Sequence, residues 1–228
     1  PIGDLTVPMF AWAAVLAAIA AVVGHAVVRG GRAAHRLVAR RALLLVPVAG
    51  IVVAGCAIAF AQATGETENA VLFSGSRALT PVVQQSAAFG AGGLAALVLF
   101  KGLAWSVSMG SFRGGPVFPA IFLGTSGGLL ASYLPGLPQG AAVAIVMGAT
   151  VAAVLRLPLA SVVIALLLTS SAGATASPPI IVAVVISYLV VGRLVAPHAA
   201  AEDATVAHAP IRMTVARLRG SRRRTSMP

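Results

Sequence analysis

Long unbroken apolar runs constrain this chain more than any other feature. Ala11–Val28 and Ala42–Ala61 each approach the ~20 apolar residues that a helix needs to cross a bilayer. In hydrocarbon every backbone N–H and C=O group must be bonded internally, which leaves only helices or a closed β-barrel. A barrel would show ~10-residue segments of alternating hydropathy, and these runs do not alternate. The sequence therefore predicts an all-α integral membrane protein.

The composition excludes a soluble domain. Hydrophobic residues make up 59% of the chain and charged residues only 9%, whereas a soluble domain carries about 25% charged residues. No spacing of His, Cys, Asp and Glu suggests a metal site, and the single cysteine, Cys56, cannot form an internal disulfide. No Ser/His/Asp set or nucleophile elbow appears. We expect neither an enzyme, nor a cofactor, nor a bound metal.

The apolar segments fall into two classes of length. Three of them are long enough to span a membrane: Met9–Val28, Ala42–Ala61 and Gly90–Ser108. The later ones are short or borderline and are separated by prolines and glycines: Phe118–Leu134, Ala141–Leu155, Val162–Thr169 and Pro178–Leu194. Short, interrupted helices are tolerated in membrane proteins where they line a cavity inside the protein. This pattern favours a multi-span bundle with broken or re-entrant helices and a transport pathway, over a scaffold of tilted or kinked helices.

Charge is concentrated in two basic clusters. The net charge is +11, and the clusters comprise Arg29, Arg32, Arg36, Arg40 and Arg41 in one connection, and Arg212, Arg217, Arg219, Arg222, Arg223 and Arg224 near the end. Basic flanks of apolar spans are typical of the cytoplasmic side and attract anionic lipid headgroups. The end of the chain lacks the interleaved aromatic residues of a nucleic-acid site, so we expect membrane lipid and not nucleic acid as a partner.

These features divide the chain into two predicted domains. Residues 1–197 form a transmembrane helical domain, and residues 198–228 form a basic, flexible cytoplasmic tail that is too short to fold by itself. The start at Pro1, without an initiating Met, suggests a segment of a longer product, or a processed or trimmed one.

The segment Ser111–Gly124 carries the strongest chemical signal. Glycines let the backbone approach an ion closely, and Pro116 suits the first position of a helix. The amides of Val117 and Phe118 would then lack intrahelical partners and, with the positive end of the helix dipole, form an anion site. The candidate anion-binding residues are Gly114, Gly115, Pro116, Val117, Phe118 and Pro119.

This segment resembles a signature of a known family. GGPVFPAIFLG, residues 114–124, is similar to the Gly-Gly-x-Phe-x-Pro motif of the CLC family of chloride channels and proton-coupled chloride transporters. Leu72–Gly75 and Lys101 resemble the run that leads into that motif, and Arg156–Leu159 resembles an Arg-x-Pro-Leu turn that follows it. The resemblance extends from about Asp4 to Leu194 and matches the carboxyl-terminal half of a family member.

The resemblance implies half of an inverted-repeat membrane fold in the cell membrane. It implies a homodimer with one pore per subunit, and transport of chloride by a voltage-gated-type channel or a chloride/proton antiporter. The family's central-site amides fall at Pro116 and Val117. Because proline has no N–H, Phe118 or a shifted helix start would have to replace one donor. The family's chloride-binding tyrosine falls at Ala172, so Ser170, Ser171 or Thr169 would have to supply a hydroxyl.

Other departures keep a second hypothesis open. The family's serine loop and its gating-glutamate loop are absent, and Leu167 stands where many members have a glutamate. All five acidic residues lie outside the apolar spans, so any proton coupling must come from another part of the protein. The alternative is a degenerate, non-conducting membrane scaffold or partner subunit. Upstream coding sequence with both loops would favour the transporter.

Two basic residues and two groups of glycines complete the predictions. Lys101 lies inside an apolar span; it is either an electropositive element beside an anion route or, as we slightly favour, a lysine that snorkels to the cytoplasmic interface. Arg156 lies between two short helices and serves either a vestibule or a helix C-terminus. The glycines are expected to allow close helix packing; they are Gly90, Gly92, Gly93, Gly124, Gly127 and Gly128.

Overall fold

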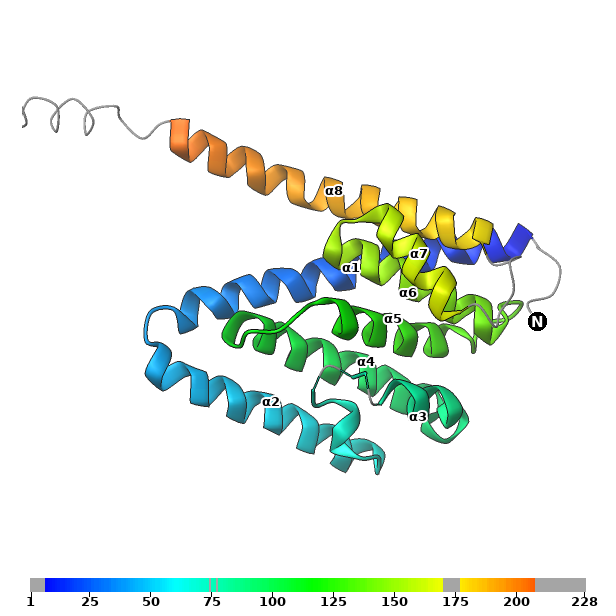
Figure 1. Ribbon diagram of the computed structural model, residues 1–228, viewed down its shortest axis with the longest axis horizontal. Coiled ribbons are helices and arrows are strands. Elements are labelled where there is room, and N and C mark those ends of the chain that lie inside the picture. Colours follow the sequence, from blue (N-terminus) through cyan, green and yellow to red (C-terminus); the bar gives the residue numbers. More distant parts are fainter. Residues whose placement is uncertain (1–6, 74, 77, 170–176, 208–228) are drawn as a thin grey trace, which may run out of the picture. The chain divides into compact units, whose positions relative to one another are not determined.

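The computed structural model describes residues 7–73, 75–76, 78–169 and 177–207, with side chains between residues 8 and 195. Within these ranges every regular element is a helix (Figure 1). In chain order they are α1 (Val7–Val38), α2 (Ala42–Thr64), the 3₁₀ turn η1 (Glu68–Ala70), α3 (Leu79–Gln84), α4 (Ser86–Ser111), α5 (Val117–Ala131), α6 (Gln139–Leu155), α7 (Pro158–Leu168) and α8 (Ser177–Ala207).

The helices form two compact units. The first comprises residues 1–191 and the second residues 192–228, and α8 crosses the boundary between them. The core and the cavities described below belong to the first unit. Because α8 continues to Ala207, it enters the segment predicted to be a flexible tail. Residues 208–228 lie outside the described part of the chain, so the nature of that tail stays a prediction.

The predicted division between long and short helices is confirmed except at Pro178–Leu194, which was predicted to be borderline and belongs with the long ones. Four helical segments are long and apolar enough to cross a membrane: Pro8–Val38, Ala42–Thr64, Ser86–Ser111 and Ser177–Val195. The helices α5, α6 and α7 have 15, 17 and 11 residues. At about 1.5 Å per residue they reach ~23, ~26 and ~17 Å, which is less than the ~30 Å hydrocarbon core. The chain is therefore an all-α integral membrane protein with short internal helices.

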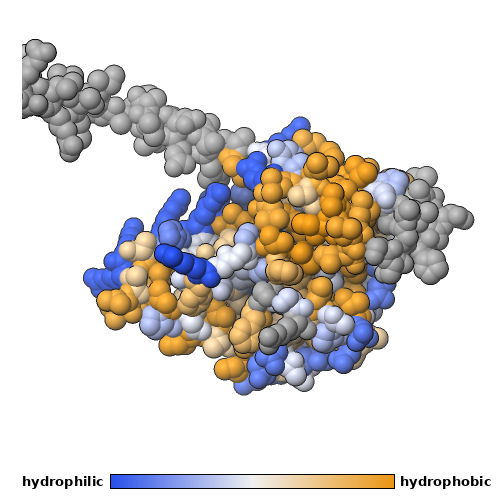
Figure 2. Space-filling view, in the orientation of Figure 1, coloured by the Kyte–Doolittle hydropathy of each residue, from blue (hydrophilic) through white to orange (hydrophobic). Residues whose placement is uncertain are grey.

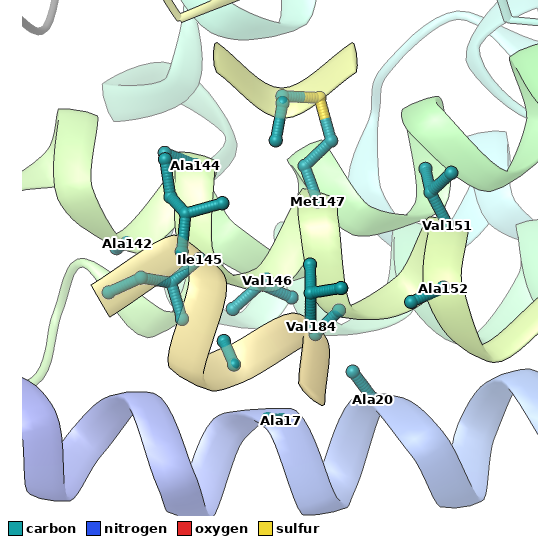
Figure 3. Close-up of a cluster of buried hydrophobic side chains, with 14 of the residues drawn as sticks. Ala17, Ala20, Ala142, Ala144, Ile145, Val146, Met147, Val151, Ala152 and Val184 are labelled. Carbon is teal, nitrogen blue, oxygen red and sulfur yellow. The ribbon is translucent and has the colours of Figure 1, made fainter. Parts of the chain in front are cut away.

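The core is built around α6, which contacts α5, α1 and α7. Figure 3 shows side chains from α1, α6 and α8 in one cluster, among them Ala17, Ile145 and Val184. These three side chains have no exposed surface. A hydrogen bond also joins α8 to α6, because the Ser187 hydroxyl donates to the carbonyl of Ala149 at 2.7 Å. Small residues let these helices approach closely, which is how helices associate in a membrane without a hydrophobic driving force.

The α5 glycines allow the closest of these approaches. A Cβ atom on Gly124 would lie 2.6 Å from the Cα of Met147, and one on Gly128 would collide with the backbone at Val143. A Cβ on Gly127 would lie 3.2 Å from a Val146 methyl group. The predicted packing role of these three glycines is confirmed.

The same expectation is wrong for the glycines near the start of α4. A Cβ on Gly90 or Gly92 would meet nothing within 4 Å, and one on Gly93 would meet only Phe89 of its own helix. Gly90 instead has φ 60° and ψ 175°, and the helix kinks there. That backbone conformation is accessible to glycine and strained for other residues, so this glycine serves a bend.

The end of α1 also differs from the predicted span Met9–Val28, because the helix continues through Gly30 and Gly31. The helix continues to Val38 and includes part of the basic connection. A Cβ on Gly30 would collide with the Ser106 hydroxyl, and one on Gly31 would lie 2.6 Å from the Met109 methyl. These two glycines therefore allow α1 to pack closely against α4, and they do not cap the helix. The start of α7 differs from the prediction as well. This helix begins at Pro158 and not at Val162, because proline suits the first helical turn.

Candidate anion site at the start of α5

A five-residue link joins α4 to α5, and α5 begins directly after Pro116. The first intrahelical bond runs from the Ala120 N–H to the Pro116 carbonyl at 3.1 Å. The amides of Val117 and Phe118 precede that bond and so have no intrahelical acceptor. No side-chain hydrogen bond caps this helix end. Two backbone donors and the positive end of the helix dipole are therefore available to a ligand.

The glycines of the link leave open space before this helix end. A Cβ on Gly114 or Gly115 would meet nothing within 4 Å, and both residues are exposed. Neither has a positive φ angle, so their backbone does not require glycine. What the two glycines provide is the absence of a side chain in front of α5.

The link forms one wall of a cavity of about 200 Å³. The other walls come from α4, from the N-terminal part of α5, from α2 and from the segment after η1. The full lining is Val53, Val71, Phe73, Lys101, Ala104, Trp105, Ser108, Met109, Phe112, Arg113, Gly114, Gly115, Pro116 and Pro119. This set contains two cationic side chains and no Asp or Glu. A helix N-terminus beside such a cavity favours a negatively charged ligand.

Lys101 is the buried charge of this cavity, and only 1% of its surface is exposed. Its ammonium group donates to the carbonyl oxygens of three consecutive residues, Val71, Leu72 and Phe73, at 2.8, 3.0 and 3.0 Å. It also lies 4.8 Å from the centre of the Phe122 ring, within cation–π range. The prediction that Lys101 snorkels to the interface is therefore wrong.

Lys101 stays buried because the backbone after η1 is irregular. Residues outside a helix have carbonyl oxygens that no helical N–H occupies, and in a membrane such groups need another donor. Lys101 has three N–H donors, and the segment presents three acceptors. Because all three donors are used, Lys101 contributes positive charge to the cavity and not a direct hydrogen bond to an anion.

The segment that holds Lys101 is itself tightly constrained. Phe73 has a φ of 58°, a conformation that is strained for a bulky residue and persists only where the surroundings fix it. Gly75 has a φ of 83°, and a Cβ there would lie 2.6 Å from the Phe122 ring. The segment is thus pinned to α4 by a cation and to α5 by close packing. The resemblance at Leu72–Gly75 marked this segment, but only the structure reveals its partners.

The structure places the other candidate residues in different positions. The side chains of Val117 and Phe118 do not line the cavity, so their predicted role rests on backbone amides. Arg156 is exposed, has a φ of 57° and caps the end of α6 through its own N–H; it is not among the cavity residues. Ser170 and Ser171 lie outside the described residues, so their proposed hydroxyl contacts stay predictions.

Two further residues at this site were not singled out from the sequence. Arg113, in the link, lines the cavity and is exposed. Ser111, the last residue of α4, has a buried hydroxyl oxygen without a hydrogen-bond partner among the described residues. Each lies within five residues of the glycines, so proximity to the motif was the available signal. Serine and arginine are too common for residue type alone to assign them a role.

The fold defines a class of protein: an integral membrane protein with short internal helices, one of which begins beside a cavity that is lined by two cationic side chains and no acidic ones. The model of the voltage gated chloride channel family matches residues 2–192, and the chain belongs to that family. Members of this family are chloride channels or transporters and not enzymes. No curated protein and no solved structure matches the chain.

Proposed function

We propose that this protein carries chloride or a related anion across the cell membrane, and that the anion is held at the start of α5. The observation that carries the proposal is the acid-free cavity, lined by Lys101 and Arg113, into which the Gly114–Gly115 link opens. The Val117 and Phe118 amides are the proposed donors. A site made of backbone dipoles with charges nearby binds an anion without holding it too tightly to leave.

The proposal also includes the pore architecture, the oligomeric state and the mode of transport, which family membership alone leaves open. The chain acts as the carboxyl-terminal half of an inverted-repeat pore, and the protein is a homodimer. Whether it works as a voltage-gated-type channel or a chloride/proton antiporter depends on a gating glutamate that these residues do not supply. The described apolar spans carry no Asp or Glu, so proton coupling requires groups elsewhere in the protein.

The test is anion efflux from liposomes that contain the purified full-length protein, with a valinomycin-driven potential. We expect flux in the wild type and its loss in Gly115→Leu, because the leucine side chain would stand in front of α5. Gly55→Leu is the matched control: a Cβ on Gly55 also meets nothing within 4 Å, and Gly55 does not line the cavity. Equal flux in both variants would refute the proposed site.

A second candidate function is a non-conducting scaffold or partner subunit. The observation that favours it is Pro116, which lies at the N-cap of α5 and removes one expected N–H donor. Leu167, where a family glutamate is often found, is 70% exposed on α7. Absence of flux from wild-type protein that is folded and inserted would favour this candidate.

A further inference from the structure

A second hollow shares one wall, Met109, with the cavity before α5, which we call the anion cavity. It has a volume of about 410 Å³ and is lined by Val28, Gly31, Arg32, His35 and Arg36 of α1 and by Met109 of α4. We call these six residues the basic hollow. Its lining holds two arginines and no acidic residue, and two of its walls, Val28 and Met109, are apolar. A ligand that fits it therefore combines negative charge with an apolar part.

The charges of the basic hollow lack a counter-charge among the residues whose side chains the structure describes. Arg32 and Arg36 are four residues apart, so they lie on one face of α1, where like charges repel. Both side chains are exposed. The acids whose side chains the structure describes, Glu66 and Glu68, follow α2, whose 23 residues separate them from the basic end by about 35 Å along the helix. An external anion would relieve the repulsion.

The depth of the basic hollow in the bilayer indicates which anion. The apolar part of α1, Met9–Val28, would fill the ~30 Å hydrocarbon core at about 1.5 Å per residue. The arginines that follow then lie at the level of the lipid headgroups. Figure 2 shows hydrophilic side chains gathered where α1 meets α2, next to an extended apolar surface. A phosphate at this level, with an acyl chain along Val28 and Met109, matches both kinds of wall.

We propose that the basic hollow binds the phosphate of an anionic membrane lipid and that the bound lipid holds α1 against the last turn of α4. The contact between these helices is close: a Cβ on Gly31 would lie 2.6 Å from the Met109 methyl, and one on Gly110 would collide with the Gly31 carbonyl. His35 adds a hydrogen bond from Nδ1 to the Gly110 carbonyl at 3.2 Å. A carbonyl can only accept, so Nδ1 carries the proton.

This contact joins the basic hollow to the anion cavity. Met109 lines both spaces, and Gly110 precedes the link that opens onto α5. A lipid that orders the end of α1 thereby orders one wall of the cavity. Binding of the lipid is independent of the proposed transport function, whereas its effect on flux rests on that function.

The binding test is native mass spectrometry of the full-length protein with phosphatidylglycerol or phosphatidylcholine. We expect selective retention of phosphatidylglycerol, weakened about thirtyfold, or roughly 2 kcal/mol, in the double variant R32Q/R36Q, because each basic residue near an anionic lipid surface contributes to binding. The matched control is R40Q/R41Q, which removes the same charge from the same end of the protein but from residues outside the basic hollow. Unchanged retention in the control supports the proposal.

Two results would overturn it. Equal loss in both double variants would mean diffuse attraction by the basic cluster and no defined site. Displacement of the lipid by soluble inorganic phosphate alone would mean a site for a free anion.

The flux assay tests the effect of the lipid on transport. Flux through the wild-type protein should be faster in vesicles containing phosphatidylglycerol than in phosphatidylcholine alone. R32Q/R36Q should lose that difference while keeping its flux in phosphatidylcholine. Flux absent from every vesicle would count against transport and leave the binding result standing.

Discussion

Two pairs of glycines near α5 have opposite surroundings. Gly124 and Gly128, inside the helix, face the backbone of α6 so closely that a Cβ has no room. Gly114 and Gly115, just before the helix, face open space. The first pair makes a short helix stable inside a membrane protein, because its backbone is packed against another helix. The second pair leaves the start of that helix accessible.

This contrast separates residues that set stability from residues that set access to the site. Substitution of an enclosed glycine should damage the fold, and transport with it. Substitution of an open glycine should damage transport alone.

The largest effect is expected for Gly128→Val. Its side chain would collide with the backbone at Val143, and overpacking at a rigid contact costs about 3 kcal/mol or more. The variant should lose most folded protein in detergent, measured by thermal unfolding and size-exclusion chromatography. Gly55→Val, on an open face of α2, is the control and should behave as the wild type. A stable Gly128→Val protein would contradict the packing described for α5 and α6.

Lys101→Met should reduce both stability and flux. Methionine keeps the length of the side chain but leaves three carbonyl groups without their donor, at about 1–3 kcal/mol for each buried group left unbonded. It also removes the buried positive charge of the cavity. We expect flux to fall at least about tenfold at low chloride, a loss of at least ~1.4 kcal/mol in anion binding, and to recover in part at high chloride.

The dependence on chloride concentration separates the two roles of Lys101. A purely structural loss would lower flux equally at all concentrations. Lys101→Arg retains the charge and should retain more flux at low chloride than Lys101→Met does. If the two variants lose flux equally at every concentration, the electrostatic role is wrong and only the structural one remains.

Gly115→Ala should reduce flux moderately and leave stability unchanged. One methyl group meets no atom within 4 Å, so the free energy of unfolding should stay within about 0.5 kcal/mol of the wild type. The methyl group narrows the space before α5, and flux should fall less than in Gly115→Leu. Thermal unfolding and liposome efflux measure the two quantities. A clear loss of stability here would remove the distinction between the two glycine pairs.

The smallest effects are expected in α4. Gly92→Ala should raise stability by about 0.5–1 kcal/mol, because glycine in a helix interior is entropically unfavourable, with no change in flux. Gly90→Ala should lower stability, because Gly90 has a φ of 60°. A Cβ meets nothing within 4 Å at either position, so the two variants differ only in the backbone angle that the alanine must adopt. Equal unfolding temperatures for the two variants would contradict the bend assigned to Gly90.

Much of the candidate site could be anticipated from the order of residues along the chain. The Gly-Gly-Pro run between two apolar segments predicted both the break after α4 and the helix that begins near Pro116, and the structure has both. The site could be anticipated because a helix start and its unpaired amides are local in sequence. The partners of Lys101 could not be, since the carbonyl groups that bind it are 28 to 30 residues away.

The order of residues was enough to predict that this protein lies in a membrane as helices, because hydrocarbon admits only helices or a closed barrel and these long runs do not alternate as barrel strands do. It also determined where the short helices are interrupted, because proline and glycine act on their own position. What each glycine does became visible only in the folded protein. Gly31 allows α1 to lie close to Met109, Gly90 bends α4, and Gly115 faces open space. These roles depend on the neighbours that folding brings to each backbone position, which the residue type does not specify.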